Sequence, residues 1–142
     1  MSHSDLQLDE IETLRRLRRH RADRAERALR EAKRTQQALL ASIRQAQDTL
    51  EQTRRDEAEQ SAQLLNEHQG QVLTFKALKS WSAQEQTLSA STQREEGQLH
   101  ELQDRREQQE IEIGSAQKQV TLCLRQVEKL HELSNLLAQE PT

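Results

Sequence analysis

The chain has 142 residues, of which 32% are hydrophobic and 32% are charged, and its net charge is −3. A globular domain of this length usually contains about 45–50% apolar residues, so the composition excludes a round hydrophobic core. Both signs of charge are interspersed, and the chain has only three Gly and one Pro. These features favour a thin helical architecture with a narrow apolar seam over disorder.

The first predicted element is a helix over about residues 5–67, with Ser4 and Gln7 at the spacing of a capping box. From residue 22 to residue 53, apolar or small residues recur at alternating steps of three and four, which is typical of a coiled coil. Alanines at residues 22, 25, 28 and 32 bury little area. We therefore expect residues 15–35 to exchange amide hydrogens faster than residues 39–50.

The pattern is least regular between residues 66 and 83, where Gly70 is the strongest local breaker. The sequence predicts a turn at about residues 68–73. A rival turn lies at residues 80–83, because Ser82 and Glu85 also have capping-box spacing. A turn at Gly70 predicts that Leu64 faces Leu78.

The second predicted helix covers about residues 74–138 and ends before Pro141. Its seam keeps the same alternation of three and four from residue 99 to residue 137. The predicted fold is all-α: residues 1–142 form a single domain, in which two long helices make an antiparallel coiled-coil hairpin. We expect this hairpin to be monomeric.

Residues 15–34, the basic segment, hold ten Lys or Arg against three Asp or Glu. Their net charge is +7, which leaves −10 for the rest of the chain. Three interpretations stay open. The segment is a solvated face partly neutralised by acids of the other arm, a docking surface for an acidic partner, or a nucleic-acid-binding region.

Most of the bulky apolar residues outside the seams lie near the predicted turn. They are Val72, Phe75, Leu78 and Trp81, which include the only aromatic residues of the chain. Their spacing of three keeps them along one stripe of a helix. They either pack the end of the hairpin or form a binding patch, because aromatic residues are enriched at interface hot spots.

No pattern of catalytic or ligand-binding residues is present. The five His are scattered without ligand spacing, and the single cysteine, Cys123, falls on the seam as a small hydrophobe. A thin hairpin cannot enclose a substrate. The sequence therefore predicts a protein without enzymatic activity, cofactor or metal. It shows neither a signal peptide nor an apolar run of about 20 residues, so we expect a soluble, cytoplasmic protein.

Residues 10–34, EIETLRRLRRHRADRAERALREAKR, resemble the N-terminal part of the YscO/FliJ family of type III secretion proteins, in its injectisome branch. The shared pattern is Leu-x-x-Leu-Arg followed by Arg/Lys-Ala-Glu-x-Ala-Leu. Its positions here are Leu14, Leu17, Arg18, Arg24, Ala25, Glu26, Ala28 and Leu29. The chain's length, its scarcity of Pro and Gly and its two-helix layout extend the resemblance over the whole chain.

The resemblance implies a stalk similar to the central shaft of rotary ATPases, at the base of a bacterial secretion apparatus that serves virulence. One end would enter the pore of the hexameric secretion ATPase, with Arg15, Arg16, Arg18 and Arg19 as contacts. The other would reach the export gate in the inner membrane through Val72, Phe75, Leu78 and Trp81. Family members also bind secretion chaperones. The resemblance implies no nucleic acid, and contact with the membrane only through partners.

Other functions remain as alternatives. A chaperone escort would belong to the same apparatus without coupling to the ATPase. A generic coiled-coil scaffold or adaptor would pair one long helix with a second copy, although Gly70 speaks against an unbroken helix. A basic nucleic-acid binder would show steep dependence on salt, but the seam beside the basic segment is alanine-rich, and a long second arm follows it.

Overall fold

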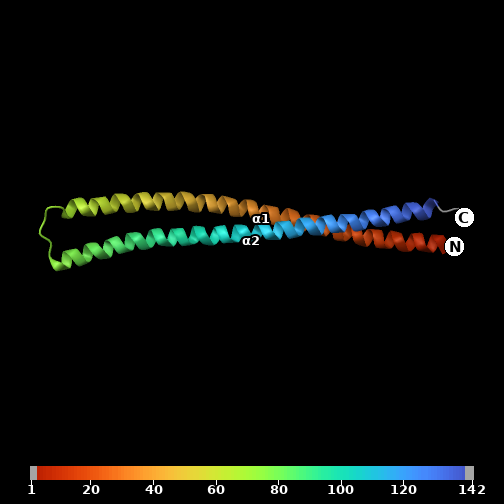
Figure 1. Cartoon of the computed structure of the whole chain (residues 1–142), viewed down its shortest axis with the longest axis horizontal. Helices are drawn as coiled ribbons and strands as arrows, with labels where there is room; N and C mark the ends of the chain where they lie inside the picture. Colours follow the sequence, from red (N-terminus) through yellow and green to blue (C-terminus); the bar gives the residue numbers. More distant parts are fainter. Residues whose placement is uncertain (1–2, 140–142) are drawn as a thin grey trace. The chain divides into compact units, whose positions relative to one another are not determined.

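The computed structural model describes residues 3–139, and the side chains from residue 5 onward. It contains two helices, α1 (His3–His68) and α2 (Phe75–Gln139), which the short segment 69–74 joins (Figure 1). The predicted all-α helical hairpin is confirmed. Pro141 and the Ser4 side chain lie outside the described part.

The chain reverses around Gly70, whose φ of +76° lies in the left-handed region that side chains with a Cβ rarely adopt. The backbone N–H of Gln71 donates to the carbonyl of His68 at 3.3 Å. The Thr74 hydroxyl then accepts the backbone N–H of Ala77 at 3.1 Å, which caps the start of α2. Residues 80–83, the rival turn, lie inside α2.

The chain divides into two compact units, each formed by a stretch of α1 and an antiparallel stretch of α2. We call residues 1–37 with 108–142 the terminal unit, and residues 38–107 the tip unit. Both helices take part in both units, because α1 and α2 each contribute residues to both.

The seam of the terminal unit is apolar and small. Ala22 has no exposed surface, and Cys123 is a buried free thiol, as predicted. Polar bonds also join the helices of this unit. The Gln109 amide donates to the carbonyl of Ala32 and the Arg18 guanidinium donates to the carbonyl of Gln126, both at 2.9 Å. The buried apolar residues of this unit are Ile11, Ala22, Ile113, Cys123 and Leu130.

The seam of the tip unit starts apolar, with buried Ile43 and Leu50, and becomes polar toward the loop. The Thr92 hydroxyl, buried in this seam, donates to the Glu57 carboxylate across the helix pair. Nearer the loop, the Ser61 hydroxyl donates to both carboxylate oxygens of Glu85, at 2.9 and 3.1 Å.

The half-buried seam positions near the loop also lose the alternation of three and four. On α1, Glu57 follows Thr53 by four residues and Ser61 follows Glu57 by another four. On α2, Trp81 and Glu85 show the same step of four. Such an additional four-residue step is a stutter, which locally unwinds the supercoil. The tip unit therefore departs from the heptad at the level where its seam is polar.

α2 begins beyond the level at which α1 ends (Figure 1). The ring of His68, the last residue of α1, stacks on Trp81 with centroids 5.0 Å apart, although Trp81 lies well inside α2. The start of α2 therefore projects past the end of α1 (Figure 1). We call this arrangement the overhang.

The pairing of Leu64 with Leu78, predicted for a symmetric turn, is wrong. Leu64 borders a groove with Ser80 and Ala83, whereas Leu78 borders a different groove with Leu65. The physical reason is the register near the loop, where Glu57 meets Thr92 and His68 meets Trp81, so that α2 is displaced along α1 relative to the symmetric pairing.

Candidate functional site

The four arginines predicted to contact an ATPase differ in what they already bind. Arg18 is half-buried, and its guanidinium donates to the carbonyl of Gln126 on α2 at 2.9 Å. The other three pair with acids of their own helix: Arg15 with Glu12 at 3.9 Å, Arg16 with Glu12 at 4.0 Å and Arg19 with Asp23 at 3.8 Å. Arg18 thus joins the two helices of the terminal unit.

The three remaining arginines stay available to a partner. The Arg16 side chain is 80% exposed and that of Arg19 is 60% exposed. Exposed ion pairs between neighbouring turns contribute little, about 0.3–0.5 kcal/mol, so a partner can displace them easily. Together with His20 and Val127, these side chains border an open groove of about 560 Å³.

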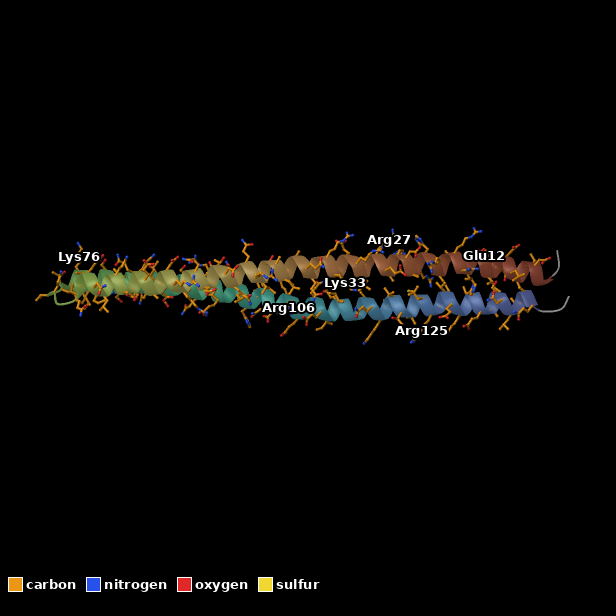
Figure 2. The ribbon with its side chains drawn as sticks, turned by 90° about the horizontal axis from the view of Figure 1, so that it is seen from above. Glu12, Arg27, Lys33, Lys76, Arg106 and Arg125 are labelled. Carbon is orange, nitrogen blue, oxygen red and sulfur yellow. The ribbon has the colours of Figure 1, made fainter. Side chains whose placement is uncertain are left out.

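A second set of basic side chains has no ion pair at all within the part of the chain that the structure describes. These residues follow one another at a spacing of three, which rotates each side chain around α1 relative to the last. All are exposed, and Figure 2 shows Arg27 pointing away from α2. They are Arg21, Arg24, Arg27, Arg30 and Lys33. These residues belong to the basic segment predicted from the sequence, but they were not identified as a separate group. Their regular spacing of three could have distinguished them from the other basic residues.

Arg21 and Arg24 border a further groove of about 350 Å³, whose floor is formed by Ala25 and Ala28 with Cys123 on α2. The alanines leave this surface hollow because their side chains reach only to Cβ. The basic segment is therefore a cationic surface with small recesses, and its ion pairs are confined to neighbouring residues of α1.

The four predicted tip residues fall into two groups, three with exposed side chains and one that packs between the helices. Val72 is fully exposed, Phe75 is 82% exposed and Leu78 is 51% exposed. Trp81 instead belongs to the helix pair, because its ring stacks on His68 and its indole N–H donates to Glu85 at 3.2 Å. The indole of Trp81 packs the hairpin, whereas the other three side chains are exposed, and a binding role for them stays a prediction.

An apolar groove of about 500 Å³ lies beside the exposed tip residues, lined by Ala62, Leu65, Leu78 and Trp81 among others. Leu65 is exposed and was not identified as a tip residue from the sequence. The sequence pattern did not indicate Leu65, because the helical periodicity of α1 continues up to the end of the helix. Only the structure shows that Leu65 borders the same groove as Leu78 and Trp81.

The described surfaces are open grooves and exposed side chains along the two helices. Among residues 3–139, no group of three or more His, Cys, Asp or Glu is placed to hold a metal ion. The seam carboxylates of Glu57 and Glu85 accept hydrogen bonds from hydroxyls and an indole, so their role is to join the helices. Neither helix, over its described length, has a stretch apolar enough to cross a membrane.

A comparison with known families identifies this chain's relatives. The family model described as Type III secretion protein YscO matches residues 11–141, which covers nearly the whole chain. No curated protein and no solved structure matches the chain significantly. The match confirms the resemblance found in residues 10–34. The chain therefore belongs to the YscO family of type III secretion proteins.

Proposed function

We propose that this protein is the cytoplasmic stalk that couples the export ATPase of a type III secretion apparatus to its export gate, without catalysing a reaction itself. The observation that carries the proposal is the row of unpaired basic side chains on the terminal unit, residues 21–33 at a spacing of three. Cationic side chains without acidic partners of their own are suited to an acidic binding surface on another protein.

A stalk of two helices acts on a ring of six subunits through its asymmetry. The basic segment lies on α1 alone, so the subunits around the terminal unit meet different surfaces. Each contact stabilises one conformation of the ATPase subunit more than another, and this difference in binding free energy is what couples one protein to another. The protein contributes contacts only, and hydrolysis stays with the ATPase.

At the other end, Val72, Phe75 and Leu78 are the candidate contacts for the export gate. Their exposed apolar surface supports this role, since exposed apolar clusters commonly mark interaction sites. Trp81 would act indirectly by holding the overhang in place through His68 and Glu85. In this role the protein is a monomeric hairpin at the base of the apparatus.

Delivery of secretion chaperones is a second candidate function. Several large apolar side chains of the terminal unit are exposed, and they are separate from the row of arginines. On α1, Leu6 and Leu17 are eleven residues apart, which returns a side chain to nearly the same helix face. The exposed residues are Leu6, Leu14 and Leu17 on α1, with Ile111, Leu122, Leu124, Leu133 and Leu136 on α2. Binding of purified chaperones that persists without the ATPase, and that Leu14→Ser with Leu17→Ser abolishes, would support this function.

The stalk function is tested with the secretion ATPase from the same genomic cluster. ATP hydrolysis is measured against added protein, using the full chain, a copy lacking residues 1–25, and the variant Arg21→Glu with Arg24→Glu. We expect the full chain to stimulate hydrolysis and the truncated copy to fail. The double variant should require about tenfold more protein for half-maximal stimulation, because charge reversal removes two attractive contacts.

The matched control is Lys76→Glu with Lys79→Glu, which makes the same change of charge at the tip. It should stimulate hydrolysis as the full chain does. If neither the full chain nor any variant changes the rate of hydrolysis or the oligomeric state of the ATPase, the stalk function is wrong. Equal loss in both double variants would instead mean that net charge, rather than the basic segment, governs the interaction.

A further inference from the structure

The loop end of the tip unit differs in composition from the rest of that unit. Residues 68–84 contain Lys76 and Lys79 but no Asp or Glu, and they include every aromatic residue of the chain. Over residues 38–107 as a whole, twelve acidic residues outnumber eight basic ones. The excess of acid therefore stops at Glu67 on α1 and begins again at Glu85 on α2, which leaves the end between them basic and apolar.

The overhang exposes this end. The start of α2 projects past the end of α1 (Figure 1), and Phe75 and Lys76 are its first two residues. Val72 and Phe75 are almost entirely exposed, and Lys76 and Lys79 are exposed beside them. Figure 2 shows Lys76 at this end of the tip unit. Apolar side chains and ammonium groups thus share one convex surface that no other described part of the unit covers.

We propose that this end, residues 69–79, binds the surface of an anionic lipid bilayer. Val72 and Phe75 enter the boundary between headgroups and acyl chains, and Lys76 and Lys79 lie at the lipid phosphates. Aromatic and aliphatic side chains with flanking lysines are the usual composition of segments that lie in a membrane interface. This inference goes beyond the proposed function, in which the membrane is reached only through partners.

The charges of the tip unit also determine how it would approach such a surface. An anionic bilayer attracts the two lysines and repels the acidic stretches that follow on both helices, within a Debye length of about 8–10 Å. The favourable approach is therefore end-on, with the loop first. Two lysines and two apolar side chains give weak, reversible binding on their own. Such a contact is useful to a protein that partners already hold near the membrane, because the second contact is then intramolecular.

The test is flotation of the purified full chain with vesicles of phosphatidylglycerol and phosphatidylcholine, compared with vesicles of phosphatidylcholine alone. The chain should float with the anionic vesicles only. Two tip variants are measured, Val72→Ser with Phe75→Ser and Lys76→Glu with Lys79→Glu. Each should lower the partition coefficient about tenfold or more. Because all four side chains are exposed, the helix content of both variants should equal that of the wild-type chain in circular dichroism.

The basic segment could also attract anionic vesicles, so a matched control is required. Arg21→Glu with Arg24→Glu makes the same change of charge in the terminal unit and should leave insertion of the tip unchanged. Insertion is read locally by placing the single Trp at the tip, with Phe75→Trp in a Trp81→Phe background. Its emission should shift to shorter wavelength with anionic vesicles, in this form and in the form that also carries Arg21→Glu and Arg24→Glu.

Two outcomes overturn the inference. The first is flotation of both tip variants at the wild-type level, which would place any vesicle binding in the basic segment. The second is no flotation and no emission shift at low salt, which would leave a protein of the export gate as the occupant of the tip. The ATPase measurement uses the terminal unit, so failure of either proposal can be distinguished from failure of the other.

Discussion

The terminal unit and the tip unit pair the same two helices in different ways. In the terminal unit the buried seam residues are apolar, and the charged residues of both helices lie outside the buried seam. In the tip unit the seam near the loop contains Glu57, Ser61, Glu85 and Thr92, joined by hydrogen bonds. One unit is therefore held by burial of apolar area, and the loop half of the other by paired polar groups.

The difference matters because the two kinds of seam contribute unequally. Burial of a Leu or Ile side chain stabilises a fold by about 1.5–3 kcal/mol, whereas a hydrogen bond adds about 0.5–1.5 kcal/mol net of what water provided. The two helices are thus joined more weakly in the loop half of the tip unit than in the terminal unit. The buried side chains of Ile43 and Leu50, which we call the apolar anchors, stabilise the tip unit most.

The largest expected effect comes from the apolar anchors. Leu50→Ala in the tip unit and Leu130→Ala in the terminal unit should each lower the free energy of unfolding by about 2–5 kcal/mol, because both side chains are 5% exposed. Urea unfolding followed by circular dichroism measures this. Leu65→Ala, at an exposed position, is the control and should cost less than about 0.5 kcal/mol. If Leu50→Ala behaves like Leu65→Ala, the tip unit is not held by its apolar anchors.

A smaller effect is expected in the polar seam. Thr92→Val should destabilise the tip unit by about 1–3 kcal/mol, because the Glu57 carboxylate keeps its place in the seam without the hydroxyl that it binds. Adding Glu57→Leu should recover most of that loss, since replacing both partners by apolar groups removes the unmet bond. Urea unfolding with hydrogen exchange at residues 85–95 follows both steps. If Thr92→Val leaves the free energy of unfolding unchanged, water reaches the Glu57 carboxylate and the seam is hydrated at this level.

The smallest effect separates two neighbouring arginines of the terminal unit. Arg18→Ala should cost about 1 kcal/mol, because it removes the bond to the Gln126 carbonyl and the packing of its stem. Arg16→Ala, where the side chain is 80% exposed, should change stability by less than about 0.5 kcal/mol. Thermal unfolding of both variants is the measurement. Equal effects would mean that Arg18 has no structural role distinct from the exposed arginines.

Much of the fold could be predicted because its causes are local. The alternation of three and four along residues 22–53 and 99–137 indicated two helices and their inward faces, and Gly70 indicated the break. The roles of Arg18 and Trp81 could not be predicted, because they depend on Gln126 and His68 of the opposite helix. The pairing of Leu64 with Leu78 failed for the same reason.

By itself, the sequence determined that the chain forms two helices, which faces they bury and which segment carries the basic charge. These follow from backbone hydrogen bonds and from a hydrophobic period of 3.5 residues, both properties of a few neighbouring turns. Only the tertiary structure decided how far α2 is displaced along α1. A coiled-coil seam repeats itself every heptad, so several axial positions bury similar faces, and the loop and polar pairs select one. That selection leaves Phe75 beyond α1 and places the Trp81 ring against His68.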